Sequence, residues 1–311
     1  MKPRALSWAF PLAAAALSLA SALSLASCAP KAHSGKKTIV VTYSVLGSVV
    51  KDLAGDAFEL VVSIPDGLDP HAWEPSAKDI EAINKADLVV ENGLGLEEGM
   101  AKALDAARKA GVKVFTATDH VVVRTVGAGE GVPSGDPDQS LGAEDPHIWT
   151  DPVTMRAVAD ALADEIKADF KLDLSKRRDE LDVRYDALDV EVAASVGKLP
   201  PDRRKLVTGH ESLGYFAQRY GFKLVGALVP SLSSQAESSA AGLVALKKLV
   251  AAEDVRVIFT EASESPKVSQ ALAAEAKVRT VPLVTHALSK DGGYEAFVRA
   301  LSTTIIGALA K

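Results

Sequence analysis

Four histidines stand at places where ligand sites form in α/β proteins. His71 comes after an expected strand that ends near Ile64, and His147 lies just beyond an acidic, glycine-rich stretch. His210 and His286 each follow directly on a β-branched run of the kind that forms buried strands. The carboxyl ends of strands in open α/β sheets face the ligand crevice, so these side chains can share one cleft. Neutral imidazole binds zinc and related metals, and four ligands complete a tetrahedral zinc site.

Two of these histidines share a five-residue pattern, Asp-Pro-His-x-Trp, at 69–73 and 145–149. Each proline restricts the backbone just before the histidine, and each tryptophan is placed to shield a buried site from water. This repeated pattern is the most specific indication of a metal site in the chain. The chain has two further histidines outside this group of four, and neither is a strong ligand candidate. His33 lies in a short polar segment, and His120 follows a short strand.

Short β-branched runs alternate with helical patterns, which predicts parallel βαβ units. The first series has expected strands at 38–43, 58–64, 88–90 and 113–115, and expected helices at 45–53, 76–85 and 97–110. The second series has expected strands at 205–208, 223–226, 255–259 and 280–284, and expected helices at 212–220, 239–252, 267–276 and 294–309. The sequence therefore predicts an α/β protein with two lobes.

Two segments of different character separate these series. Residues 126–146 are rich in glycine, proline and acidic side chains, so we expect a mobile surface loop there. From Pro152 to about Lys198 the pattern is helical, which predicts two helices or one long connecting helix that ends before Pro200. The expected division is an N-terminal lobe over 38–170, a connecting helix over 171–199 and a C-terminal lobe over 200–311.

The composition excludes several classes of protein. The chain has 311 residues, of which 48% are hydrophobic and 24% charged, as in an ordinary globular protein of about two domains. Its net charge is −6, without a dense basic stripe, so no nucleic-acid partner is expected. Cys28 is the only cysteine, so neither an intramolecular disulfide nor a cysteine zinc cluster can form. The phosphate-binding motif of ATPases does not occur.

The first 27 residues are typical of an export signal. Lys2 and Arg4 precede an apolar run from Ala5 to Ala26, which fits a secretory signal rather than a stable membrane span. The run closes on Leu-Ala-Ser-Cys, which resembles the bacterial lipobox, so Cys28 is the expected lipidation site and residues 28–37 a polar tether. An ordinary cleaved signal that leaves a free cysteine is the alternative. We expect the protein in the cell envelope, lipid-anchored on the extracytoplasmic side, in the periplasm or at the cell surface.

Longer segments around the histidines closely resemble the zinc- and manganese-binding lipoproteins of ABC importers, the cluster A-I solute-binding proteins. The matching segments are 69–76, 87–97, 145–152 and 209–216, with a weaker match at 259–261. The resemblance implies two Rossmann-like lobes joined by one long rigid helix, with the metal in the cleft between them. It also implies a monomer, not an enzyme, that captures a divalent metal and delivers it to a membrane permease with a separate ATPase.

The resemblance implies three histidine ligands, His71, His147 and His210. The fourth ligand of the family is usually an Asp or Glu in a segment after the last strand. In this chain His286 takes the place of that acid. Asp291, five residues later, is the alternative fourth ligand.

Nitrogen-rich ligation favours Zn2+ over Mn2+, because carboxylate oxygen suits manganese better than imidazole does. Manganese or iron as the physiological metal remains the alternative. Glu211 and Glu261 lie within the last two of the resembling segments and are expected beside the ligands or as substitutes for one of them. The loop before His147 holds no histidine, unlike the histidine-rich tract of many zinc receptors in this family, so we expect its acids to attract cations only weakly.

Two other classes of function compete with metal capture. A secreted zinc hydrolase would use three histidines and an open water position, with Glu211 or Glu261 as the base. No His-Glu-x-x-His motif supports that class. A surface adhesin or scaffold is the other class, and it would have no need of histidines that face inward.

Overall fold

The computed structural model describes residues 35–131, 135–261, 266–288 and 292–311. Residues 37–311 form one compact unit, and Gly35 and Lys36, which precede it, are exposed. The expected export signal, the lipidation site Cys28 and the alternative ligand Asp291 lie outside the described residues. In the described part of the chain, no helix is long and apolar enough to cross a membrane.

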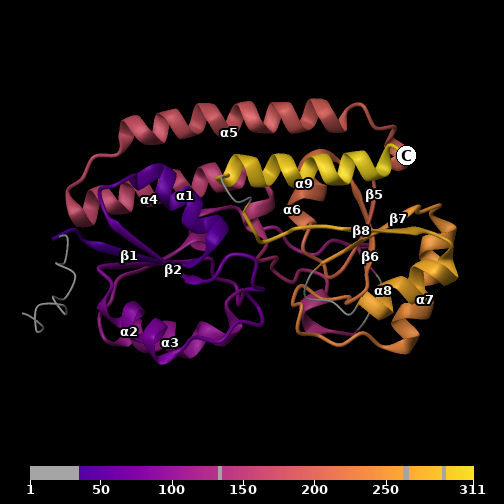
Figure 1. Ribbon diagram of the computed structural model, residues 1–311, viewed down its shortest axis with the longest axis horizontal. Helices are drawn as coiled ribbons and strands as arrows, with labels where there is room; N and C mark the ends of the chain where they lie inside the picture. The colour runs from indigo at the N-terminus through magenta and orange to yellow at the C-terminus, as the bar shows by residue number, and fades with distance from the viewer. Residues whose placement is uncertain (1–34, 132–134, 262–265, 289–291) are drawn as a thin grey trace, which may run out of the picture. The chain divides into compact units, whose positions relative to one another are not determined.

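A four-stranded parallel sheet forms the N-terminal lobe, in the order β2-β1-β3-β4 (Figure 1). Strand β1, one of the two interior strands, is a mostly β-branched run in which every residue after the first is buried, as in parallel strands that are covered on both faces. The elements of this lobe are β1 (Thr38–Tyr43), α1 (Ser44–Ala54), β2 (Glu59–Ile64), α2 (Ala77–Lys85), β3 (Leu88–Glu91), α3 (Ala101–Lys109) and β4 (Val114–Thr116).

The C-terminal lobe holds two parallel strand pairs, β5-β6 and β7-β8. Its elements are β5 (Lys205–Thr208), α6 (Gly214–Tyr220), β6 (Lys223–Ala227), α7 (Ala240–Ala252), β7 (Val257–Thr260), α8 (Pro266–Ala276), β8 (Arg279–Pro282) and α9 (Tyr294–Leu309). The expected second βα series is confirmed, but its last strand ends at Pro282 and not at Val284. The N–H of Leu283 donates to the Thr260 carbonyl at 2.8 Å, and the chain then leaves the sheet.

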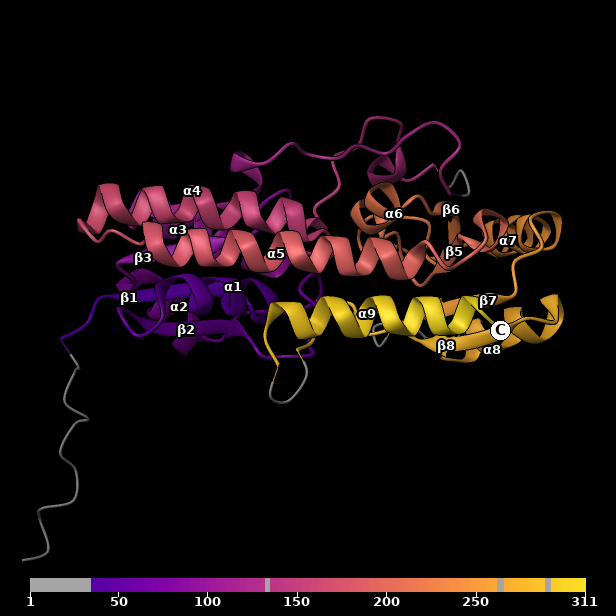
Figure 2. The same cartoon turned by 90° about the horizontal axis from the view of Figure 1, so that it is seen from above.

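The helical stretch between the lobes consists of two helices, α4 (Pro152–Phe170) and α5 (Ser175–Val196). The first of them ends at Phe170, because the left-handed backbone of the next residue, Lys171, with φ of 58°, cannot continue a helix. Figures 1 and 2 show α5 running alongside both lobes, where it packs against α1 and α4 of the N-terminal part and against α6 and α9 of the C-terminal lobe. The connecting helix is therefore somewhat shorter than the 171–199 expected from the sequence.

Buried hydrogen bonds join the lobes at the tryptophan of the second Asp-Pro-His-x-Trp segment. The indole N–H of Trp149 donates to the carbonyl of Thr285 at 2.6 Å, and the hydroxyl of Tyr294 donates to the carbonyl of Trp149 at 3.0 Å. One hydrophobic cluster also runs through both lobes and the connecting helix. The lobes therefore hold each other through packing as well as through α5.

Candidate metal centre

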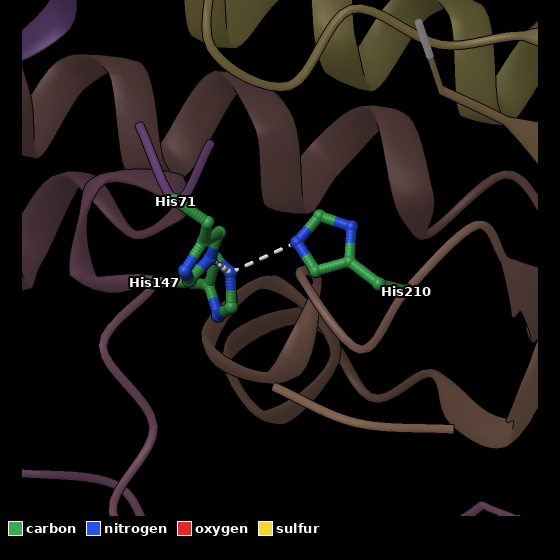
Figure 3. Close-up of side chains that lie close together, drawn as sticks. All are labelled: His71, His147 and His210. Atoms are coloured by element: carbon green, nitrogen blue, oxygen red, sulfur yellow. Dashed lines mark hydrogen bonds between the residues drawn. The ribbon is translucent and has the colours of Figure 1, made fainter. Parts of the chain in front are cut away.

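Three histidines from distant parts of the chain converge on one point (Figure 3). The Nε2 atom of His147 lies 3.4 Å from Nε2 of His71 and 3.2 Å from Nε2 of His210. One ligand atom from each residue falls within 4.8 Å of the others, and all three side chains are buried. Since His71 and His147 belong to the N-terminal lobe and His210 follows β5, the centre lies between the lobes.

A carboxylate stands behind each of these imidazoles, on the side of the ring away from the shared point. An acid at Nδ1 favours a proton on that nitrogen and leaves the lone pair of Nε2 for a metal, which is the usual arrangement around metal-binding histidines. The carboxylate-to-Nδ1 pairs are Asp145 with His147 at 2.8 Å, Glu98 with His71 at 3.4 Å and Glu261 with His210 at 3.4 Å.

The two Asp-Pro-His segments fold into the same local turn. The backbone N–H of His71 donates to Oδ1 of Asp69 at 3.0 Å, and that of His147 donates to Oδ1 of Asp145 at 2.9 Å. Such an aspartate accepts from the backbone two residues on and so fixes the turn without regular structure. The repeated sequence pattern therefore reflects a repeated way of presenting a histidine.

The environment of His147 keeps its imidazole neutral. Burial lowers the pKa of His147 to about 4; the carboxylate of Asp145 opposes this effect, while His210 and His71 add to it. Burial alone would raise the pKa of Glu261, but His210, His286 and the hydroxyl of Thr285 outweigh it and lower that pKa to about 2. Unprotonated nitrogens with ionised carboxylates behind them suit a divalent cation.

His286, the expected fourth ligand, is buried near this group but outside it. Its pKa is lowered by burial; Glu261 and Asp69 oppose that shift, and His210 and His71 add to it, so the ring lies within their electrostatic range. Nδ1 of His286 lies 2.9 Å from Oγ1 of Thr285, a hydroxyl that donates to Glu261 at 2.6 Å.

The acidic loop before His147 packs against the rest of the chain at several points. Arg124 pairs with Asp145 at 3.0 Å and also with Glu130, and the amide of Gln139 donates to Glu211 at 2.7 Å. Glu211, one of the two acids expected beside the ligands, therefore contacts the loop. Within this expected loop, the residues Pro137–Gln139 form a short 3-10 turn, so the segment holds some regular structure.

A cavity of about 500 Å³ borders the centre on the His71 side. Its lining includes the carboxylates of Glu98, Asp138 and Glu144, together with Ser233 from the opposite lobe. It offers a path by which a cation can reach the histidines.

His120 does not belong to the histidine cluster. Its side chain is exposed and stacks on Phe115, with ring centroids 4.4 Å apart.

Sequence reasoning missed two features of the centre. Glu98 was not singled out, and Asp145 was noticed only as part of a repeated pattern, whereas its carboxylate contacts both the backbone and the ring of His147. Glu98 lies in the short 3-10 turn Glu98–Met100 that precedes α3, and no local pattern marks it as a neighbour of His71. Only the three-dimensional approach of the two segments reveals that pairing.

Two α/β lobes, a helix that packs on both of them and a histidine centre in the cleft between define a solute-binding protein that takes a metal ion as its cargo. The comparisons identify the family. The model of the periplasmic component A of the zinc-uptake complex matches residues 39–308, so the chain belongs to that family.

Individual relatives agree with this assignment. The chain is 28% identical to the zinc-binding protein TroA of Treponema pallidum over 298 residues, which cover 90% of this chain and 91% of that one. It is 32% identical to the zinc-binding lipoprotein AdcA of Streptococcus pneumoniae over 83% of its own length, but spans only 52% of that longer protein. The manganese ABC transporter substrate-binding lipoprotein PsaA of Streptococcus pneumoniae is 26% identical over 84% of both chains.

The solved structure of the periplasmic zinc-binding protein TroA of Treponema pallidum has the same fold. It superposes with a TM-score of 0.74 at 26% identity, and the match covers 89% of this chain and all of that one. The two-lobe fold implied by the sequence resemblance is thereby confirmed.

Proposed function

We propose that this protein captures a divalent transition metal, zinc in the first place, outside the cytoplasm and delivers it to the permease of an ABC importer, whose ATPase is a separate chain. The observation that carries the proposal is that Nε2 of His71 and Nε2 of His210, from two lobes, lie 3.4 Å and 3.2 Å from Nε2 of His147. Three imidazole nitrogens that converge on one point supply most of the donors of a tetrahedral metal centre.

His286 is the fourth ligand in this proposal. If Nδ1 of His286 donates to the hydroxyl of Thr285, which itself donates to Glu261, the ring also keeps its Nε2 lone pair free. The arrangement then matches that of the other three histidines, with a hydroxyl inserted between ring and carboxylate. A small adjustment of the segment after β8 brings this nitrogen to the metal.

Zinc fits these donors better than manganese does. A set of three or four imidazoles suits zinc, whereas manganese prefers carboxylate and water oxygens. The nearest carboxylates face Nδ1 atoms and stand behind the rings, so they supply negative charge without supplying oxygen ligands. Manganese is the second candidate, since the family includes proteins that bind it.

The same geometry disfavours a hydrolase. A catalytic base must reach the metal-bound water, on the Nε2 side of the rings. Glu261 instead accepts hydrogen bonds from Ser212 at 2.8 Å and Thr285 at 2.6 Å, on the Nδ1 side of His210. Glu211 is held by Gln139 at the loop. We therefore assign the protein a binding role and no catalysis.

The remaining proposals concern how the protein is held and divided. We propose that Cys28 carries the lipid anchor, that residues 28–37 are the tether, and that the anchored protein acts as a monomer. The N-terminal lobe would span 38–170, the connecting segment with its helix α5 171–199, and the C-terminal lobe 200–311. Mass spectrometry of the protein purified from membranes tests the anchor, because acylation adds a defined mass to a peptide that begins at Cys28.

Calorimetric titration of residues 35–311 with zinc tests the function. We expect one zinc per chain, and a His71→Ala/His147→Ala/His210→Ala variant that remains folded but binds none. His120→Gln is the matched control and should bind as the wild type does, since His120 stacks on Phe115 away from the cluster. Equal zinc binding by the triple variant would refute the proposal.

A further inference from the structure

His71 is held at both of its polar ends by carboxylates. Its backbone N–H donates to Oδ1 of Asp69 at 3.0 Å, and its Nδ1 lies 3.4 Å from Oε1 of Glu98. The imidazole is buried, so the position of its Nε2 depends on the turn that Asp69 holds and on the Glu98 carboxylate beside Nδ1. Any group that fixes the two carboxylates therefore also fixes this ligand.

Two adjacent serines of the C-terminal lobe donate to those same carboxylates. The hydroxyl of Ser233 donates to Oε1 of Glu98 at 2.5 Å, and the hydroxyl of Ser234 donates to Oδ2 of Asp69 at 2.6 Å. The contacts span 135 and 165 residues of sequence and cross the cleft between the lobes. A hydroxyl that donates to an ionised carboxylate forms one of the stronger hydrogen bonds in proteins.

The segment that carries these serines, residues 229–235, is also tied to the turn that presents His210. The N–H of Val229 donates to the carbonyl of Gly209 at 2.8 Å, and the N–H of Glu211 donates to the carbonyl of Ser231 at 3.0 Å. Hydrogen bonds therefore lead from the His210 turn through this segment to the carboxylates that hold His71. The segment follows β6, at the carboxyl end of that strand.

We infer that Ser233 and Ser234 are positioning residues for His71, a latch through which the C-terminal lobe holds an N-terminal ligand at the metal. The inference rests on the proposed function and adds how the ligand set is kept closed. His147 needs no such latch, because the second oxygen of Asp145 accepts from Arg124, within the N-terminal lobe, at 3.0 Å. Breaking the latch frees His71 alone and lets the metal leave sooner.

The rate of zinc release tests the latch. We compare Ser233→Ala, Ser234→Ala and the double variant, each loaded with zinc and then mixed with excess chelator. The control is Ser238→Ala, whose hydroxyl donates to the carbonyl of Leu228, in its own lobe, at 2.5 Å. The double variant should release zinc roughly 10-fold faster, as for other groups that orient metal ligands, and bind it at an unchanged rate. The Ser233→Thr/Ser234→Thr variant keeps both hydroxyls and should restore slow release.

Hydrogen exchange at the amide of His71 gives a readout that needs no metal. This amide should exchange faster in the metal-free double variant than in the wild type or Ser238→Ala. Wild-type release and exchange rates in the double variant would overturn the latch, and so would equal acceleration by Ser238→Ala. A wild-type protein that binds no zinc would instead overturn the proposed function, and the exchange experiment would still decide the latch.

Discussion

Nε2 of His147 lies 3.2 Å from Nε2 of His210, although 63 residues separate the two histidines and they belong to different lobes. Two neutral imidazoles gain little from such an approach, because two lone pairs directed at each other repel. The approach becomes favourable when a cation joins them. The relationship therefore links the fold, which sets the two lobes against each other, to the binding of a metal.

The fourth ligand is open to direct test by substitution. We expect His286→Ala to weaken zinc binding as strongly as His71→Ala, because each removes one ligand from a tetrahedral site. Asp291→Ala should leave the affinity unchanged. His286→Asp should retain a working site and shift preference modestly towards manganese, since carboxylate oxygen is the harder donor. Competitive titrations with zinc and manganese measure all three, and loss of binding only in Asp291→Ala would assign the fourth ligand to Asp291.

The carboxylate behind His147 should matter nearly as much as a ligand. Asp145→Asn keeps the size of the side chain but removes the charge that orients the imidazole through Nδ1. We expect zinc affinity to fall roughly 10- to 100-fold, as for other acids behind metal-bound histidines. Asp179→Asn, on the exposed face of α5, is the matched control. Unchanged zinc affinity in Asp145→Asn would show that the acid only shapes the turn.

The stability of the metal-free protein should depend on the protonation of His147. Its pKa is about 4 in the fold, because of burial, and about 6.5 in the unfolded chain. Between these values only the unfolded chain binds the proton, so the free energy of unfolding should decrease as pH falls from about 6.5 to about 4. The loss from this residue is on the order of 3 kcal/mol. Urea unfolding at a series of pH values measures it, and His147→Gln should show a shallower dependence.

The indole of Trp149 should hold the lobes together at the site. Trp149→Phe removes the N–H that donates to the Thr285 carbonyl and leaves that buried carbonyl without its partner. We expect a loss of about 1–3 kcal/mol in the free energy of unfolding and weaker zinc binding through displacement of His286. Trp73→Phe, in the other Asp-Pro-His-x-Trp segment, makes the same change at a half-buried position and should have a smaller effect on both measurements.

The lobes should move little when the metal binds. The helix α5 packs against both lobes, and the Trp149 hydrogen bonds add a second connection near the site. Hinge bending would have to break this packing as well as bend a continuous helix. Small-angle scattering of the metal-free and zinc-loaded protein should therefore give nearly equal radii of gyration, and a wide domain rotation would contradict this account.

Much of the fold could be predicted from the sequence, because each strand of a parallel sheet is a short buried β-branched run. The first strand is predicted to the residue, at Thr38–Tyr43. The last strand is predicted to end two residues too late, since Val284 is β-branched but lies beyond the final hydrogen bond of Leu283. A residue's type indicates its preference for a strand, whereas the end of the strand depends on which neighbour it meets.

The histidines of the site could be predicted for a similar reason, and their partners could not. An Asp-Pro-His segment forms its turn locally, so His71 and His147 stand out in the sequence. Glu98 and Ser233 meet beside His71 only after the lobes have come together. Contacts of this kind depend on tertiary packing and leave no spacing pattern along the chain.

X-ray absorption at the zinc edge, on residues 35–311 loaded with one equivalent of zinc, tests the central claim most directly. It reports the type, number and distance of the atoms bound to the metal. We predict three or four imidazole nitrogens at about 2.0–2.1 Å, with the outer-shell scattering of histidine rings. Loss of one imidazole in each of His71→Ala, His147→Ala and His210→Ala would assign the ligands individually. A zinc shell made only of oxygen atoms, unchanged in these variants, would contradict the account.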